Sequence, residues 1–115
     1  MTAVQPLRGE VWDLNFDPIT GPVPDGTGAA LVLSEDIFNE GPAGLIVVAP
    51  ITRAQRKIRW HVPVSLPESG LEWESFIQCE DVRSVSKQRL RHPRGRVAAA
   101  TMQQVEDRLR ILLSL

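Results

Sequence analysis

Short apolar segments separated by turn-forming residues constrain the fold of this chain most strongly. Four of them have strand patterns: GEVWDLNF at 9–16, AALVLS at 29–34, GLIVVAPIT at 44–52 and RWHVPVSL at 59–66. The first alternates, with Trp12, Leu14 and Phe16 on one apolar face. The second and third are continuous apolar runs, which is typical of strands buried on both faces. The fourth contains Pro63, and a proline restricts a strand to a sheet edge or a bulge.

Weaker patterns follow in the second half of the chain. WESFIQCEDVRSV at 73–85 predicts one more strand, and GRVAAA at 95–100 suggests a brief last one. Five or six short strands with turn residues between them indicate a small barrel or a sandwich. We therefore expect a mainly β fold in a single domain spanning residues 1–115, closed by one helix at its end.

The last segment, ATMQQVEDRLRILLSL at 100–115, has a helical pattern. Thr101 and Gln104 have the spacing of a capping box, which predicts the helix start. The residues of one apolar stripe are Met102, Val105, Leu109 and Leu112. Further apolar residues widen this surface at the end of the helix, namely Ile111, Leu113 and Leu115. This width favours a homodimer, because a monomer would leave the surface in water.

Several classes of protein are excluded by what the sequence lacks. The longest apolar run, 44–51, is far shorter than the roughly 20 residues of a membrane-spanning helix, and residues 1–7 lack the apolar core of a signal peptide. We therefore expect a cytoplasmic protein with no membrane association. The single cysteine, Cys79, has no partner for a disulfide and no metal-ligand spacing around it, so we expect a buried thiol, no metal site and no cofactor.

Charge is unevenly distributed although the net charge is only −1. Residues 1–40 carry seven acidic side chains and one base, Arg8. Ten of the thirteen basic residues lie in 53–96: Arg53, Arg56, Lys57, Arg59, Arg83, Lys87, Arg89, Arg91, Arg94 and Arg96. If the fold gathers them, one face suits a phosphate backbone or an acidic partner. Otherwise they are scattered, solvated charges on loops.

A loop rich in proline and glycine, 17–28, separates the first two predicted strands. Its prolines restrict the unfolded chain, and its glycines permit tight turns and the close approach of another backbone. A loop of this length in a small domain is usually functional or mobile.

Four segments, in order, resemble one protein family. RGEVWDLNFDPITG, ALVLSEDIFN, VVAPIT and CEDVRSVSKQRL are similar to successive motifs of the MazF/PemK/Kid toxins of type II toxin–antitoxin systems, and the resemblance extends from Arg8 to about Leu115. It implies a homodimer of small SH3-like β-barrels that cuts single-stranded RNA at short sequences without a metal. It also implies an antitoxin partner whose acidic tail covers the RNA groove.

Metal-free RNA cleavage has general chemical requirements. The ribose 2′-OH must lose its proton and attack the phosphate, the leaving 5′ oxygen must gain a proton, and the added negative charge needs a cation or a donor. The resemblance assigns central roles to a threonine, matched here by Thr52, and to an arginine, whose position is occupied by Gly28. Loss of such a donor typically lowers the rate by a factor of about 10²–10³.

Residues of the following loop are candidates to replace that cation. If the strand continues past Thr52, alternation points Arg53 away from the face of Thr52, which leaves Arg56 and Arg59 as the better candidates. In the segment after 73, Gln78 and Glu80 are expected to share a strand face, and the resemblance suggests Glu80 as a general base. The predicted catalytic residues are thus Thr52, Arg56 and Glu80. The predicted RNA-binding residues are Asp17, Pro18, Gly28, Arg53, Lys57, Arg59, Gln78 and Arg83.

The remaining histidines and tryptophans receive simpler interpretations. His61 and His92 are expected at the surface or on an edge strand, and Trp12 and Trp60 in the core. Trp73, between Glu72 and Glu74, is either an ordinary surface residue or a platform on which a base stacks.

Three functions stay open at this point. The first is an active endoribonuclease with a rearranged site around Thr52, and the second is a catalytically weak relative that binds RNA or antitoxin. The third is a gyrase poison like the CcdB toxins, which have a related fold. Those toxins end in an aromatic-tipped helix, whereas this chain ends in ILLSL, so this third function fits the sequence least well.

Overall fold

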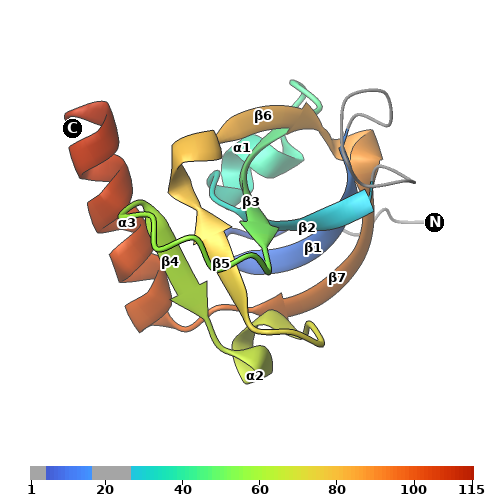
Figure 1. The fold of residues 1–115 in the computed structure, drawn as a ribbon. Helices are drawn as coiled ribbons and strands as arrows, with labels where there is room; N and C mark the ends of the chain where they lie inside the picture. The colour runs from blue at the N-terminus through green and yellow to red at the C-terminus, as the bar shows by residue number, and fades with distance from the viewer. Residues whose placement is uncertain (1–4, 17–26) are drawn as a thin grey trace.

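The computed structural model of the chain describes residues 5–16 and 27–115. Its strands are β1 (Glu10–Asn15), β2 (Thr27–Val32), β3 (Leu45–Thr52), β4 (His61–Val64), β5 (Ser75–Gln78), β6 (Arg83–Ser86) and β7 (Leu90–Arg96). Its helices are α1 (Asp36–Glu40), α2 (Leu66–Ser69) and α3 (Ala99–Leu113), and two single 3₁₀ turns are η1 (Cys79–Asp81) and η2 (Lys87–Arg89). The expected mainly β fold with a C-terminal helix is confirmed (Figure 1).

The strands form one antiparallel sheet that curls into a barrel-like wall (Figure 1). Their order is β4-β5-β3-β2-β1-β7. The long strand β3 has two successive neighbours on one side, because β6 pairs with its first half and β5 with its end at Ile51 and Thr52. Strand β4 lies at the sheet edge, as Pro63 predicted.

Two of the later segments differ from the prediction. Residues 73–85 hold two strands separated by η1, so Gln78 ends β5 whereas Glu80 lies in the turn, and the two do not share a strand face. The last strand is β7, earlier and longer than the segment 95–100 predicted for it. Its residues are mostly polar and exposed and include a proline, so it lacks the apolar pattern by which strands are recognised.

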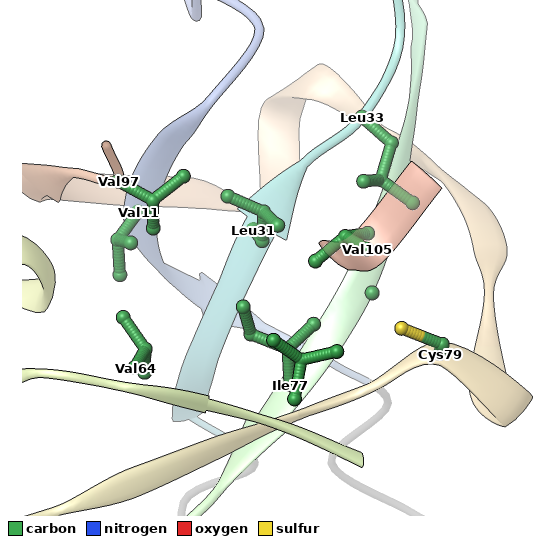
Figure 2. Close-up of a cluster of buried hydrophobic side chains, with 10 residues drawn as sticks. Val11, Leu31, Leu33, Val64, Ile77, Cys79, Val97 and Val105 are labelled. Atoms are coloured by element: carbon green, nitrogen blue, oxygen red, sulfur yellow. The ribbon is translucent and has the colours of Figure 1, made fainter. Parts of the chain in front are cut away.

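The core lies on both faces of the sheet. The larger cluster joins Val11, Leu31, Ile77 and Cys79 to Val105 of α3 (Figure 2). The smaller cluster contains Leu14, Ala30, Ile46 and Val48, with Phe16, Val85 and Leu90 against it. Strand β1 contributes to both, so its single predicted apolar face was incomplete. The core position of Trp12 is confirmed, and Trp60 packs half-buried against the larger cluster.

Helix α3 packs through its predicted stripe but starts differently. Val105 is fully buried, and Met102 and Leu109 contact the larger cluster. The expected capping box of Thr101 and Gln104 is absent. Instead, the Thr101 hydroxyl and the Ala98 amide both donate to the Glu68 carboxylate of α2, at 2.6 and 2.7 Å. A charged acceptor from another element has replaced the local one, because it binds two donors at once.

Two further findings concern the helices. The apolar residues at the end of α3 are exposed, with Ile111 and Leu113 at 55% and Leu115 at 84%. No helix within the described residues is long and apolar enough to cross a membrane.

Candidate active site

An open groove of about 730 Å³ lies where β1, β2 and β3 meet the loop between α2 and β5. The residues that line it are Asp13, Thr27, Gly28, Ala29, Ile51, Thr52, Arg53, Gly70, Leu71, Glu72, Trp73, Ser75 and Arg94. It brings together three predicted site residues, namely Gly28, Thr52 and Arg53, with Trp73, one interpretation of which was a platform for a base.

Gly28 and Thr52 are neighbours across two paired strands. Ala29 of β2 pairs with Ile51 of β3, and Gly28 and Thr52 are the next residues outward on each strand. The Thr52 hydroxyl oxygen accepts a hydrogen bond from the Ala54 amide at 3.1 Å, which fixes its orientation. Its own proton can still be donated, for example to a phosphate oxygen.

The space in front of Gly28 is occupied by Phe16. A Cβ atom added at Gly28 would lie 3.1 Å from Cε2 and 3.4 Å from Cδ2 of the Phe16 ring. The guanidinium carbon of Arg83 lies 5.4 Å from the centre of the same ring. Any side chain at Gly28 would therefore require Phe16 to shift, and a cation from β6 already lies near this position.

Two arginines line the groove in different electrostatic states. Arg94 donates to Asp13 at 2.6–2.7 Å, and this hydrogen bond raises the pKa of Arg94. Arg53 lies 5.0 Å above the ring of Trp73, and among the described residues no carboxylate lies within ion-pair distance of it. Arg53 is thus the groove cation whose charge remains available to a phosphate.

The structure favours Arg53 over Arg56 and Arg59 as the cation near Thr52, opposite to the sequence prediction. Strand β3 ends at Thr52, so strand alternation no longer applies to Arg53, which lines the groove instead of pointing away. Arg56, Lys57 and Arg59 are exposed and do not line it. Arg59 instead lies 4.9 Å above the ring of Trp60.

The residues predicted around η1 lie outside the groove. Glu80 accepts a hydrogen bond from His61 Nε2 at 2.9 Å. His61 is only 9% exposed, and its Nδ1 has no hydrogen-bond partner among the described residues, so this histidine is on an edge strand but not at the surface. Gln78 pairs with His61 across β4 and β5. Arg83 is exposed and bonded to Asp81 at 2.6 Å.

The thiol of Cys79 is buried, as predicted. Burial, with a smaller contribution from Glu80, raises its pKa to about 11, so it stays protonated. Within residues 5–16 and 27–115, no three His, Cys, Asp or Glu side chains are grouped so that they could hold a metal ion. Asp17 and Pro18, which the sequence assigns to RNA binding, lie outside the described residues.

Sequence reasoning missed Asp13 and Arg94 as groove residues. They are 81 positions apart and meet only because β1 pairs with β7. No local pattern pointed to this pair, because Asp13 falls on the more polar face of an alternating strand.

Residues 7–113 match the family model of the PemK-like, MazF-like toxin of type II toxin–antitoxin systems. The chain belongs to this family. Among curated relatives, the chain is 34% identical to Endoribonuclease MazF9 of Mycobacterium tuberculosis over 113 residues, covering 94% of this chain and 96% of the relative. It is 31% identical to Endoribonuclease EndoA of Bacillus subtilis, covering 94% of each.

Solved structures of MazF toxins have the same fold. The crystal structure of MazF from Deinococcus radiodurans aligns with a TM-score of 0.81 at 25% identity, covering 98% of this chain and 100% of that one. An endoribonuclease from a mycobacterial species, solved in complex with its cognate antitoxin, aligns with a TM-score of 0.79 at 23% identity, covering 96% of each chain.

Proposed function

We propose that this MazF/PemK family member is a cytoplasmic toxin that cleaves single-stranded RNA at short sequences without a metal ion. The observation that carries the proposal is the position of Thr52, on the wall of an open groove beside a cation that has no carboxylate partner among the described residues. The likeness to two relatives named endoribonucleases over nearly the whole chain supports it.

The residues of the groove have distinct parts in this reaction. The 2′ hydroxyl gives its proton to a general base as its oxygen attacks phosphorus, the bond from phosphorus to the 5′ oxygen breaks, and that oxygen takes up a proton from a general acid. The Thr52 hydroxyl donates a hydrogen bond to a phosphate oxygen, and Arg53 offsets the charge that builds up there. Arg53 is favoured over Arg56 because it lines the groove. Arg94 contributes less charge, since Asp13 neutralises it.

The general base and acid of the reaction stay predictions. Glu80 is the sequence candidate for the base, yet its carboxylate accepts from His61 at 2.9 Å outside the groove. Its assignment requires RNA that extends beyond the groove, or a second subunit that brings another Glu80 close.

A catalytically weak relative that binds RNA or antitoxin is the second candidate function. It is favoured by Phe16, whose ring occupies the space in front of Gly28 where the family resemblance expects an arginine. In this case the groove and the exposed arginines around it hold RNA, or the acidic tail of an antitoxin, without cutting.

One experiment separates the two functions. Purified protein is incubated with a long mixed-sequence RNA in EDTA, and primer extension locates any cuts. The Thr52→Ala, Arg53→Ala and Arg56→Ala variants are compared, with Thr52→Ser as the matched control that retains the hydroxyl. Discrete cuts that disappear in Thr52→Ala and Arg53→Ala but persist in Arg56→Ala and Thr52→Ser support the proposal. Intact RNA together with measurable binding supports the weak relative.

The partners of this chain are also proposed from its family. One solved neighbour is an endoribonuclease bound to its cognate antitoxin, which supports an antitoxin partner for this chain. A homodimer is favoured by the exposed apolar end of α3. We expect an acidic antitoxin tail to compete with RNA for the groove, which a filter-binding competition would measure.

A further inference from the structure

Trp73 is a large aromatic residue held in an exposed position. Its side chain is 57% exposed, whereas Trp12 is buried and Trp60 half-buried. It lies on the groove that also contains Thr52, and its own ring carries the guanidinium of Arg53 at 5.0 Å. The same groove therefore holds an aromatic face beside the residues proposed to contact phosphate.

The loop that carries Trp73 is fixed at both ends. Gly70, with φ +69°, packs so closely on β7 that a Cβ there would lie 1.8 Å from the Arg94 carbonyl oxygen. After the tryptophan, the Ser75 hydroxyl donates to the Trp73 carbonyl at 2.8 Å. Between them, Leu71 packs against the larger core cluster. Trp73 is thus presented to solvent by an anchored loop, which lowers the entropy cost of binding.

The surroundings of Trp73 favour a base over a phosphate. Glu72 precedes it in the chain and lines the same groove, and its carboxylate disfavours phosphate oxygens on the ring. A nucleobase is neutral and stacks on an aromatic face whatever its identity. The guanidinium of Arg53 can stack on a base as well, since it is planar. The carboxylate of Glu72 likewise disfavours an acidic side chain on the ring itself.

We propose that Trp73 and Arg53 form a nucleobase-binding subsite, on which one unpaired base of the RNA stacks next to the scissile phosphate. The subsite deepens the proposed function, because it names where a base near the cut is held. The carboxylate of Asp13 and the guanidinium of Arg94 lie on the same groove and supply an acceptor and donors for the edge of that base.

Tryptophan fluorescence tests the subsite without requiring cleavage. The chain contains no tyrosine, so its emission comes from three tryptophans, of which Trp73 is the most exposed. The probes are mixed-sequence 12-mers of 2′-O-methyl RNA, which lack the attacking hydroxyl and stay intact. We expect them to quench the emission of the native protein and of Trp60→Phe, the matched control. The quenching should be absent in Trp73→Phe.

Affinity measured by anisotropy of a labelled 12-mer gives a second readout. Trp73→Ala should weaken binding by roughly 5- to 150-fold, which is the range for one base stacked on an aromatic ring. Trp73→Phe should retain most of the affinity, because it keeps an aromatic face. Circular dichroism confirms that each variant is folded, as expected for an exposed side chain.

Several results would overturn the subsite. They are unchanged affinity in Trp73→Ala, quenching that persists in Trp73→Phe, or quenching by an Asp- and Glu-rich 12-residue peptide but not by RNA. The last result would assign this surface to the antitoxin. Failure of the proposed function looks different: RNA would bind with Trp73-dependent quenching and yet stay uncut in EDTA. Cleavage with the same sites and rates in Trp73→Ala would retain the function and reject the subsite.

Discussion

Replacing Glu68 by glutamine tests how α2 and α3 are joined, because this carboxylate accepts four hydrogen bonds. Ala98 and Thr101 donate to one oxygen at 2.7 and 2.6 Å, and the amide and hydroxyl of Ser65 donate to the other at 3.2 and 2.7 Å. Burial alone would raise the pKa of Glu68. The hydrogen bonds from Thr101, Ala98 and Ser65 outweigh burial and lower the pKa from 4.5 to about 2.

The size of the effect follows from that pKa. A change from 4.5 to about 2 corresponds to at most ~3 kcal/mol of folding free energy at neutral pH. Glu68 is partly exposed, so solvent screening reduces the expected loss in Glu68→Gln to roughly 1–2 kcal/mol. This loss should lower the Tm by roughly 4–10 °C. Glutamine offers one acceptor oxygen, so at least two of the donors lose their partner.

The pH dependence gives the sharper measurement. Because the folded-state pKa lies below the ordinary value, the stabilisation is complete above about pH 4.5 and is lost as the pH falls toward 2. Thermal unfolding of the native protein and of Glu68→Gln should thus differ at pH 7 and converge near pH 2. Glu74→Gln, which removes the same charge from an exposed residue, is the control. A Tm difference that stays constant from pH 7 to pH 2 would refute the reasoning.

Three other perturbations have defined outcomes. Gly28→Arg should raise the rate of RNA cleavage by up to ~10²–10³-fold once Phe16 moves aside. Gly28→Ala, which only crowds the Phe16 ring, should not raise it. If Gly28→Arg cleaves RNA no faster than Gly28→Ala, a missing cation is not what limits the rate. The Cys79 thiol, buried and with its pKa raised to about 11, should resist Ellman's reagent at pH 8 in the folded protein and react in guanidinium. Leu113→Lys should shift the protein toward monomer in light scattering, while Gln103→Lys, on the same helix, should not; a dimer unaffected by both would place the interface elsewhere.

The fold was predictable where the pattern was local. The first four strands and the helix stripe follow from apolar periodicity, and the edge position of β4 follows from Pro63. The start of α3 was not predictable in this way. Its capping carboxylate comes from Glu68, 33 residues before Thr101, and no local pattern reveals a partner at that distance. The extent of strand β7 was not predictable for a different reason. Its backbone pairs with β1, and this pairing does not require apolar side chains on β7.

The candidate site was predictable in its centre and not at its edges. Thr52 and Gly28 were found through family motifs, and the pairing of β2 with β3 brings them together. Arg53 was misplaced because alternation was extended one residue beyond the end of β3. Asp13 and Arg94 depend on a long-range ion pair, which no local sequence pattern reveals.

Charge compensation explains why the groove depends on so few cations. The ion pair of Arg94 with Asp13 lies within the groove, and Glu72 adds a further negative charge to its wall. Gly28 stands in place of an arginine, and Arg83 and Arg94 are paired with carboxylates, so Arg53 is the groove cation without such a partner among the described residues. That side chain already lies over Trp73, so a base stacked on this pair would hold the guanidinium close to the phosphate. Binding of the base and stabilisation of the phosphate charge are therefore coupled through one residue, and an RNA that places no base at Trp73 should be cut slowly even though its phosphate reaches Thr52.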